Sequence, residues 1–280
     1  MAALRAGLSD YGYVEGKNIV IDFRSADGQF ARLPILATEL ARLRVDLIVT
    51  GGTPATLAAK NATTTIPIVM VNTGDAVGTG LIASLARPGG NVTGVTILSP
   101  QLIAKRLELV KEMLPRTRTV AAILNPANPA QKLSYEAMES TARFLGIDLY
   151  KFEVRGPKEF EATFSVMAKR NVDALVAPQD AMMDTHAQEI ADFTAKMRIP
   201  SAGNKIFADA GGLIGYGVDA VETFRRAATY VDKIIKGAKP AELPVEQASK
   251  FFLILNLKTA KALGITIPQS LLVRSDELIQ

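Results

Sequence analysis

The stretch VDLIVTGGTPATLAAKNATTTIPIVMV, residues 45–71, decides the fold. It opens with a short run rich in β-branched residues, which suits a strand buried on both faces. Thr53 then offers a helix N-cap, and Pro54 falls where a first helical residue tolerates proline. Alanines recur at helical spacing, and a second apolar run at 66–71 predicts another strand. The stretch therefore predicts a strand, helix and strand in succession.

The start of the predicted helix at 53–63 is a candidate anion site. The backbone amides of Ala55 and Thr56 are expected to point out of the helix end, beside the Thr53 hydroxyl and at the positive end of the helix dipole. The simpler interpretation is that Thr53 only caps its own helix, because caps are common and ligand sites are few. The rest of the chain has to decide between the two.

Composition excludes several classes of function. The net charge of +4 is spread along the chain, aromatic residues make up 6% and Trp is absent, so nucleic acid is a poor candidate partner. The chain has no Cys, which excludes disulfides and thiol catalysis and fits an oxidising compartment. No apolar run approaches the roughly 18 residues that a membrane span needs.

The chain alternates predicted strands and helices from end to end. A first set continues to about residue 98, and a second set of the same kind follows, so the sequence predicts two similar doubly wound α/β lobes. We expect one lobe to hold residues 1–98 and 218–247, and the other to hold 99–217 and 248–280. Further elements are predicted as strands at 19–23, 119–124, 148–153 and 212–216, and as helices at 78–86, 130–145, 184–196 and 218–235.

Polar residues follow the strands of both predicted lobes, at the edge where ligands of parallel sheets bind. Taken singly, each of these residues is as easily a helix cap or a core residue. Because polar residues occur at five successive turns, a ligand cleft explains them better than chance does. Besides the turn at Thr53, Pro54, Ala55 and Thr56, these candidates are Asp75 and Val77, Asn125 and Asn128, Asp180, and Tyr216 and Asp219.

Catalytic and cofactor motifs are weak. His186, the only histidine, lies in a polar predicted helix with no second His or any Cys near it, so we expect a solvated residue and no metal. GTGLIA at 78–83 resembles a dinucleotide fingerprint, but it lies too far from the preceding strand and lacks the acidic residue that should follow. No nucleophile and base are paired, so the sequence predicts neither an enzyme nor a cofactor.

The chain resembles the family of ABC-transporter substrate-binding proteins typified by tryptophan-type binding lipoproteins, which have the type I periplasmic binding protein fold. The resemblance spans nearly the whole chain. It rests on the stretch quoted above and on GYVEGKNIVIDFR (12–24), GLIASLARPGGNVTGVT (80–96), YVDKIIKGAKPAELPVEQ (230–247) and NLKTAKALGITIPQSLLVRSDELI (256–279). One departure is Asp75-Ala76-Val77, where the family has Asp-Pro-Val.

The resemblance implies a periplasmic protein that holds a small ligand, usually a carboxylate, between two hinged lobes and delivers it to a membrane ABC permease. Thr53, Pro54 and Ala55 would bind the carboxylate, and Tyr216 and Asp219 would lie near the hinge. The ligand would be an amino acid, aromatic amino acids included, or a related organic acid. For an amino acid, Asp219 is the first choice and Asp180 the second choice to meet the ammonium group.

The family usually begins with a signal peptide and a first strand, and neither is found in this chain. In the type I fold that strand lies between the strands at Ile19 and Val45, so we expect a contact between two copies of the chain, a shifted strand or low stability. Two other functions stay open at this point. One is a ligand-sensing module of the same fold, and the other is an α/β enzyme.

Overall fold

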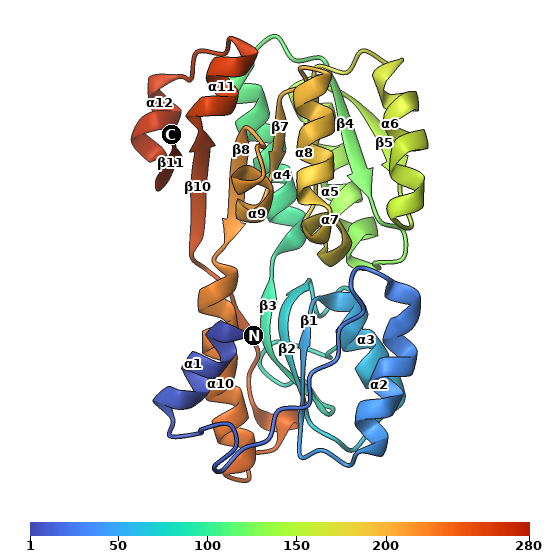
Figure 1. Cartoon of the computed structure of the whole chain (residues 1–280), viewed down its shortest axis with the longest axis vertical. Helices are drawn as coiled ribbons and strands as arrows, with labels where there is room; N and C mark the ends of the chain where they lie inside the picture. Colours follow the sequence, from blue (N-terminus) through green and yellow to red (C-terminus); the bar gives the residue numbers. More distant parts are fainter. The chain divides into compact units, whose positions relative to one another are not determined.

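The chain folds as two α/β units, and the computed structural model describes all of residues 1–280. Unit 1 consists of Met1–Leu98 and Asp219–Ser249, and unit 2 consists of Ser99–Val218 and Lys250–Gln280. Each unit is an open sheet covered by helices (Figure 1). No helix in the structure is both long enough and apolar enough to cross a membrane.

Unit 1 is built on four parallel strands in the order β1-β2-β3-β9. These strands are β1 (Ile48–Gly51), β2 (Ile68–Gly74), β3 (Val92–Ile97) and β9 (Glu246–Gln247). The helical segments of unit 1 are α1 (Ala2–Asp10), η1 (Phe30–Arg32), α2 (Leu33–Arg42), α3 (Thr53–Ala62), α10 (Ala220–Ile235) and η3 (Pro240–Glu242).

Strand β2 shows why this sheet is covered on both faces. Its residues alternate between two apolar clusters, because successive side chains of a strand point to opposite faces. Val69 and Val71 pack in the cluster formed with α1 and α10, whereas Ile68 and Met70 pack in the cluster that contains Ala59 of α3. All four β2 side chains are fully buried. The continuous apolar run in the sequence thus reflects a strand with helices on both sides.

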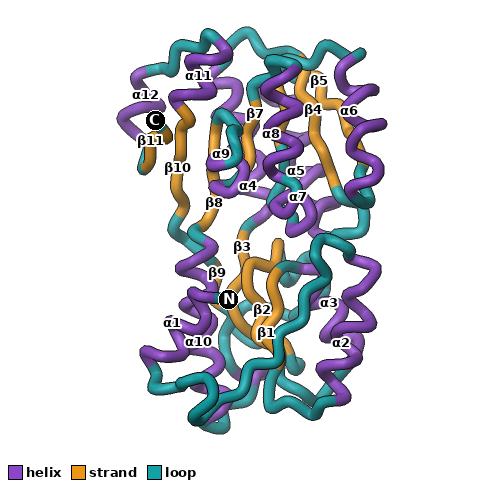
Figure 2. Tube along the Cα trace, viewed as in Figure 1, coloured by secondary structure: helices purple, strands orange, loops and turns teal.

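The strand predicted at 19–23 does not form. Only an isolated bridge joins Glu15 to Ile19, and the segment runs as a coil (Figure 2). Ile19 and Ile21 pack on the cluster of α1 and α10, but Val20 is 82% exposed. The physical reason is the lack of a neighbour, since β1 pairs with β2 alone and no strand lies beside the 19–23 segment to share its hydrogen bonds.

The helix predicted at 78–86 is also absent. Residues 76–80 form a turn instead, in which the amide of Gly78 donates to Asp75 Oδ1 at 2.9 Å and the amide of Leu81 donates to the Ala76 carbonyl at 2.9 Å. Gly80 has a φ of +73°, which is outside the helical region. The glycines of this segment therefore favour a turn over a helix.

Unit 2 contains seven strands in the order β11-β10-β8-β7-β6-β4-β5, and only the β8–β10 pair is antiparallel. The strands are β4 (Thr119–Leu124), β5 (Asp148–Glu153), β6 (Ala174–Val176), β7 (Ser201–Gly203), β8 (Ile214–Val218), β10 (Phe251–Asn256) and β11 (Glu277–Ile279). The helices are α4 (Ser99–Met113), α5 (Ala130–Leu145), α6 (Phe160–Ala168), α7 (Ala181–Thr185), α8 (Ala187–Lys196), α9 (Lys205–Asp209), α11 (Leu257–Leu263) and α12 (Gln269–Arg274), with the short η2 (Pro157–Glu159).

The core of unit 2 lies between the sheet and its helices. Helices α4 and α5 pack against each other on one side of the sheet, and α8 lies on the other side (Figure 1). Ile103 and Leu107 of α4, Val120 of β4 and Met138 of α5 belong to one buried cluster. On the α8 side, the rings of Phe164 of α6 and Phe193 of α8 stack with centroids 4.0 Å apart.

The helix predicted at 184–196 is two helices with a break at His186. Asp180, and not Asp184, is the N-cap of the first helix, α7, and accepts the amides of Met182 and Met183. Helix α9 and helix α12 were not predicted. Both are short, and α9 depends on a local cap in which Asn204 Oδ1 accepts the amide of Phe207 at 3.1 Å.

Candidate functional site

The turn from β1 into α3 has the predicted position but a different cap. Gly52 is the N-cap, with φ 82° and ψ 162°, so Thr53 is the first helical residue and Pro54 the second. The prediction that Thr53 caps its own helix is therefore wrong. Its Oγ1 instead accepts the amide of Gly74 at 2.9 Å, which ties the start of α3 to the end of β2. The hydroxyl proton of Thr53 is left available as a donor.

The two backbone amides predicted as free donors at this turn differ in whether they already have a hydrogen-bond partner. The amide of Ala55 makes no hydrogen bond in the structure. The amide of Thr56, by contrast, donates to the Gly52 carbonyl at 3.2 Å, and its hydroxyl bonds Gly52 and Thr50. Thr56 is fully buried and its amide already has a partner, so the prediction of a free amide at Thr56 is wrong. Unit 1 thus offers the Thr53 hydroxyl and the Ala55 amide at the start of a ten-residue helix.

The end of β2 carries backbone strain next to this turn. Asn72 and Asp75 both have a positive φ, of 54° and 45°, and the pairing of β2 with β3 shifts register between Met70 and Thr73. The side-chain oxygen of Asn72 is buried without a hydrogen-bond partner. Such strain is concentrated at functional sites. Val77, another predicted residue, is 43% exposed in the turn that follows.

Unit 2 brings three predicted residues together. Asn128 Nδ2 donates to Asp180 Oδ2 at 2.8 Å, and Asn125 Nδ2 lies 3.3 Å from Asp180 Oδ1. All three side chains are buried. Burial raises the pKa of Asp180, while the donors from both asparagines and from the α7 amides act in the opposite direction. Asn128 is not the N-cap of α5, which is Pro129, although Asn128 Oδ1 accepts the amide of Ala130 just before the helix.

Asp184 lies close to this group, and burial also perturbs its carboxyl group. Burial and the nearby Asp180 raise the pKa of Asp184 to about 7, against the effects of an Asn204 hydrogen bond of 2.7 Å and of the Arg106 charge. The sequence predicted Asp184 only as the start of a polar helix at 184–196, because burial cannot be seen in a locally polar stretch.

Tyr216 and Asp219 lie at and after the end of β8. The Tyr216 ring packs against Phe251 with centroids 6.1 Å apart, and burial raises its pKa. Asp219 is the N-cap of α10, where its Oδ1 accepts the amides of Val221 and Glu222 at 2.7 and 3.2 Å. Its Oδ2 accepts no hydrogen bond. Whether either residue touches a ligand stays a prediction.

Sequence reasoning missed Arg106, which lies 1% exposed on α4. Its Nε donates to the Tyr216 carbonyl at 2.8 Å and its Nη1 donates to the Ala177 carbonyl at 2.7 Å. A signal was present, because Arg106 shares the helical spacing of the buried Leu102, Ile103 and Val110. A cation on the apolar face of a helix indicates a buried polar partner.

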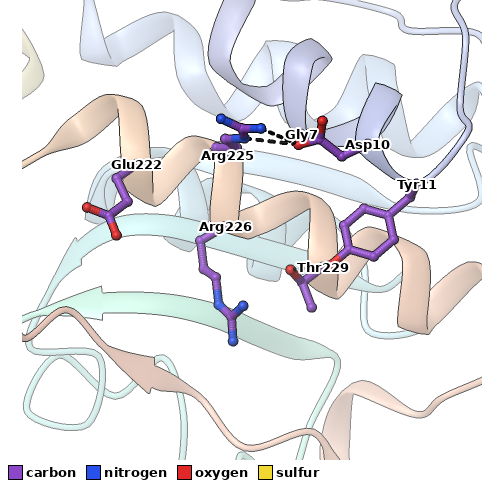
Figure 3. A pocket seen from close by; sticks show the side chains of 7 residues that line it. All are labelled: Gly7, Asp10, Tyr11, Glu222, Arg225, Arg226 and Thr229. Carbon is purple, nitrogen blue, oxygen red and sulfur yellow. Dashed lines mark hydrogen bonds and ion pairs between the residues drawn. The ribbon is translucent and has the colours of Figure 1, made fainter.

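A surface groove of ≈ 460 Å³ lies between α1 and α10 of unit 1, and none of the predicted site residues lines it (Figure 3). Its cations are paired, since Arg225 bonds Asp10 at 2.7 Å and Arg226 bonds Glu246 at 2.6 Å. No cluster of His, Cys, Asp or Glu could hold a metal ion. The polar groups that end the strands are therefore the better candidate site.

Comparison with known proteins shows to which family the chain belongs. Residues 1–279 match the family described as "ABC transporter substrate binding protein". The chain belongs to this family. The family consists of solute-binding proteins and not of enzymes, so the chain is a substrate-binding component of an ABC importer. The predicted type I periplasmic binding protein fold is likewise confirmed.

Three relatives of this substrate-binding protein are informative. A tyrosine-binding protein of Clostridioides difficile is 29% identical over 260 residues, which cover 92% of this chain and 74% of that protein. The crystal structure of an ABC domain from Streptococcus pneumonia in complex with L-Trp is 29% identical, with a TM-score of 0.91 over 99% of this chain and 94% of that chain. A conserved domain protein of Vibrio cholerae is 30% identical, with a TM-score of 0.93 over 99% and 93%.

Proposed function

We propose that this chain captures an aromatic α-amino acid in the periplasm and delivers it to the membrane permease of its ABC importer. The observation that carries the proposal is the pair of free donors at the start of α3, formed by the Thr53 hydroxyl and the Ala55 amide. Two relatives support the ligand class, since one is named for tyrosine and the other holds L-Trp.

The carboxylate of the ligand is assigned to unit 1. An acceptor with a negative charge is favoured at the N-terminus of a helix, where backbone amides lack partners and the helix dipole is positive. The Gly74 amide occupies one lone pair of Thr53 Oγ1 and so directs its proton elsewhere. Ala55 adds a second donor from the same helical turn.

The ammonium group is assigned to Asp219, with Asp180 as the alternative. Asp219 keeps one carboxylate oxygen without a hydrogen bond, because Oδ1 alone caps α10. Asp180 has both oxygens engaged by asparagine side chains and α7 amides. A carboxylate with a free oxygen loses fewer existing hydrogen bonds when it accepts an ammonium group.

Titration of the purified protein with L-tryptophan and L-tyrosine tests the ligand class. The chain contains no Trp, so the emission of added L-tryptophan reports its own binding without background from protein tryptophan. Titration calorimetry gives the affinity for L-tyrosine and for glycine, which lacks the aromatic group. Failure of both aromatic amino acids to bind at millimolar concentration would refute the proposal.

Two variants test the assigned residues. Thr53→Val removes one hydrogen bond to a charged group and should weaken binding about 10- to 100-fold, or about 1.5–3 kcal/mol, whereas Thr53→Ser keeps the hydroxyl and should bind like the wild type. Asp219→Asn should weaken L-tyrosine by at least as much but leave its deaminated analogue nearly unchanged. Equal affinities of wild type and Thr53→Val would remove the carboxylate assignment.

A further inference from the structure

Strand β2 contains one extra residue close to the turn into α3. The pairing of β2 with β3 advances by three residues on β2, from Met70 to Thr73, but by only two residues on β3. Asn72 lies inside this bulge and has a φ of 54°, in the left-handed region. Bulges are rare between parallel strands, and they occur next to functional sites, where they redirect neighbouring groups.

The extra residue reverses the direction of the backbone groups that follow it. Backbone amides two residues apart in a strand point to the same side, and a slip of one residue exchanges the sides. The amide of Ile68 donates to the carbonyl that directly precedes β3, so without the bulge the amide of Gly74 would face β3 as well. It donates instead to Thr53 Oγ1 at 2.9 Å, and the amide of Asp75 takes the β3 side by donating to the Ile97 carbonyl at 3.0 Å. The bulge therefore turns the Gly74 amide toward Thr53.

The bulge has a cost within unit 1. A left-handed backbone is disfavoured for residues other than glycine, although asparagine tolerates it better than most. The side-chain oxygen of Asn72 is also buried without a hydrogen-bond partner, which costs free energy. The pairing of β1 with β2 does not need the bulge, because it ends before Asn72, at Val71. A local cost of this kind indicates that the geometry serves the binding site.

We propose that Asn72 is a positioning residue for the carboxylate of the ligand. Its bulge brings the Gly74 amide to one lone pair of Thr53 Oγ1, so the proton of the Thr53 hydroxyl points elsewhere and is donated to the ligand. Asn72 acts through Gly74 and Thr53, and all three residues belong to unit 1. The inference rests on the proposed function, because it requires that Thr53 meets the carboxylate.

Hydrogen exchange of the Gly74 amide, followed by NMR, tests the positioning step without any ligand. Asn72→Val should make this amide exchange about tenfold faster or more than in the wild type, because a β-branched residue disfavours the left-handed region and favours a regular strand. Asn72→Gly tolerates the same φ and should keep the protection of the wild type. If Asn72→Val does not fold, Asn72→Ala takes its place. Unchanged protection of Gly74 in the folded variant overturns the inference.

A double-mutant cycle with Thr53→Val separates positioning from a merely structural effect. Asn72→Val should weaken L-tyrosine binding about tenfold or more in the wild-type background but less than about threefold in the Thr53→Val background, since coupled residues give non-additive losses. Asn171→Val is the matched control, because Asn171 has a φ of 49° in the turn before β6 of unit 2, and it should bind like the wild type. Equal losses in both backgrounds would show that Asn72 does not act through Thr53.

The two measurements also separate this inference from the proposed function. If the wild type binds neither L-tyrosine nor L-tryptophan, the proposed function fails, and the role of Asn72 in binding falls with it whatever the Gly74 amide does. If the wild type binds these amino acids and either the exchange or the cycle gives the contrary result, the inference alone fails.

Discussion

Asp184 shows how a single residue can carry a pH dependence. Its carboxyl group is buried on α7, receives one hydrogen bond from Asn204, and has Asp180 and Arg106 as its charged neighbours. Its pKa is about 7 in the folded protein, against 3.8 for the ordinary value. Because the folded state holds this proton more tightly than the unfolded state, Asp184 favours folding at low pH and less so as the pH rises.

We predict that Asp184→Asn gains stability relative to the wild type as the pH rises from 5 to 8. Between the unfolded and folded pKa values the wild type loses up to about 1.4 kcal/mol per pH unit through Asp184, whereas asparagine does not titrate. Urea unfolding of both proteins at pH 5, 6, 7 and 8 measures the difference. A constant difference across this range would show that Asp184 does not titrate there.

The turn between β1 and α3 is the element on which the proposed carboxylate site depends. Gly52 adopts φ 82° and ψ 162°, a conformation that is nearly restricted to glycine. This conformation turns the chain from the strand into the helix so that Thr53 reaches the Gly74 amide. The two glycines of the quoted stretch therefore have a geometric role.

We predict that Gly52→Ala destabilises the protein by about 1–3 kcal/mol, because a Cβ strains this backbone conformation. Ligand affinity should fall as well, since the Ala55 amide and the Thr53 hydroxyl would be displaced. Denaturant unfolding and calorimetry measure the two effects, and Gly90→Ala serves as a control in unit 1, where a Cβ meets nothing within 4 Å. Wild-type stability of Gly52→Ala would contradict the assigned strain.

At the scale of the whole molecule, each unit has its own sheet and its own buried clusters. Both sheets are open, but two of the four strands of unit 1, β1 and β9, are edge strands, whereas only β5 and β11 of the seven strands of unit 2 are. Strand edges with unpaired backbone groups are less protected than central strands. The smaller sheet of unit 1 is therefore the part in which a bound ligand should add most to stability.

We predict that L-tyrosine at 100 times its Kd stabilises the protein by about 2.7 kcal/mol, because it binds the folded state alone. This should raise Tm by several degrees in a calorimetric scan. The same concentration of ligand should raise the Tm of Thr53→Val by clearly less, and glycine should leave the wild type unchanged. An equal rise for Thr53→Val and wild type would separate Thr53 from binding.

The sequence by itself determined the alternation of strands and helices along the chain. The predicted strands at 119–124 and 148–153 and the helix at 130–145 coincide with β4, β5 and α5, because period and length are local properties that neighbouring residues carry. The turn at Thr53 was found in the same way, from two glycines, a hydroxyl and a proline. Family membership followed because these stretches span the chain.

Only the tertiary structure decided which polar groups already have hydrogen-bond partners within the protein. The 19–23 segment stays unpaired because strand formation needs a neighbour, which no local pattern supplies. The amide of Thr56 is bonded to the Gly52 carbonyl, and Asp184 is buried although it lies in a locally polar stretch of sequence. Arg106 remained hidden because its partners lie 71 and 110 residues away along the chain. Burial and long-range hydrogen bonding arise when separate elements pack together. A sequence pattern shows only the periodicity within one helix or strand, so it cannot show these contacts.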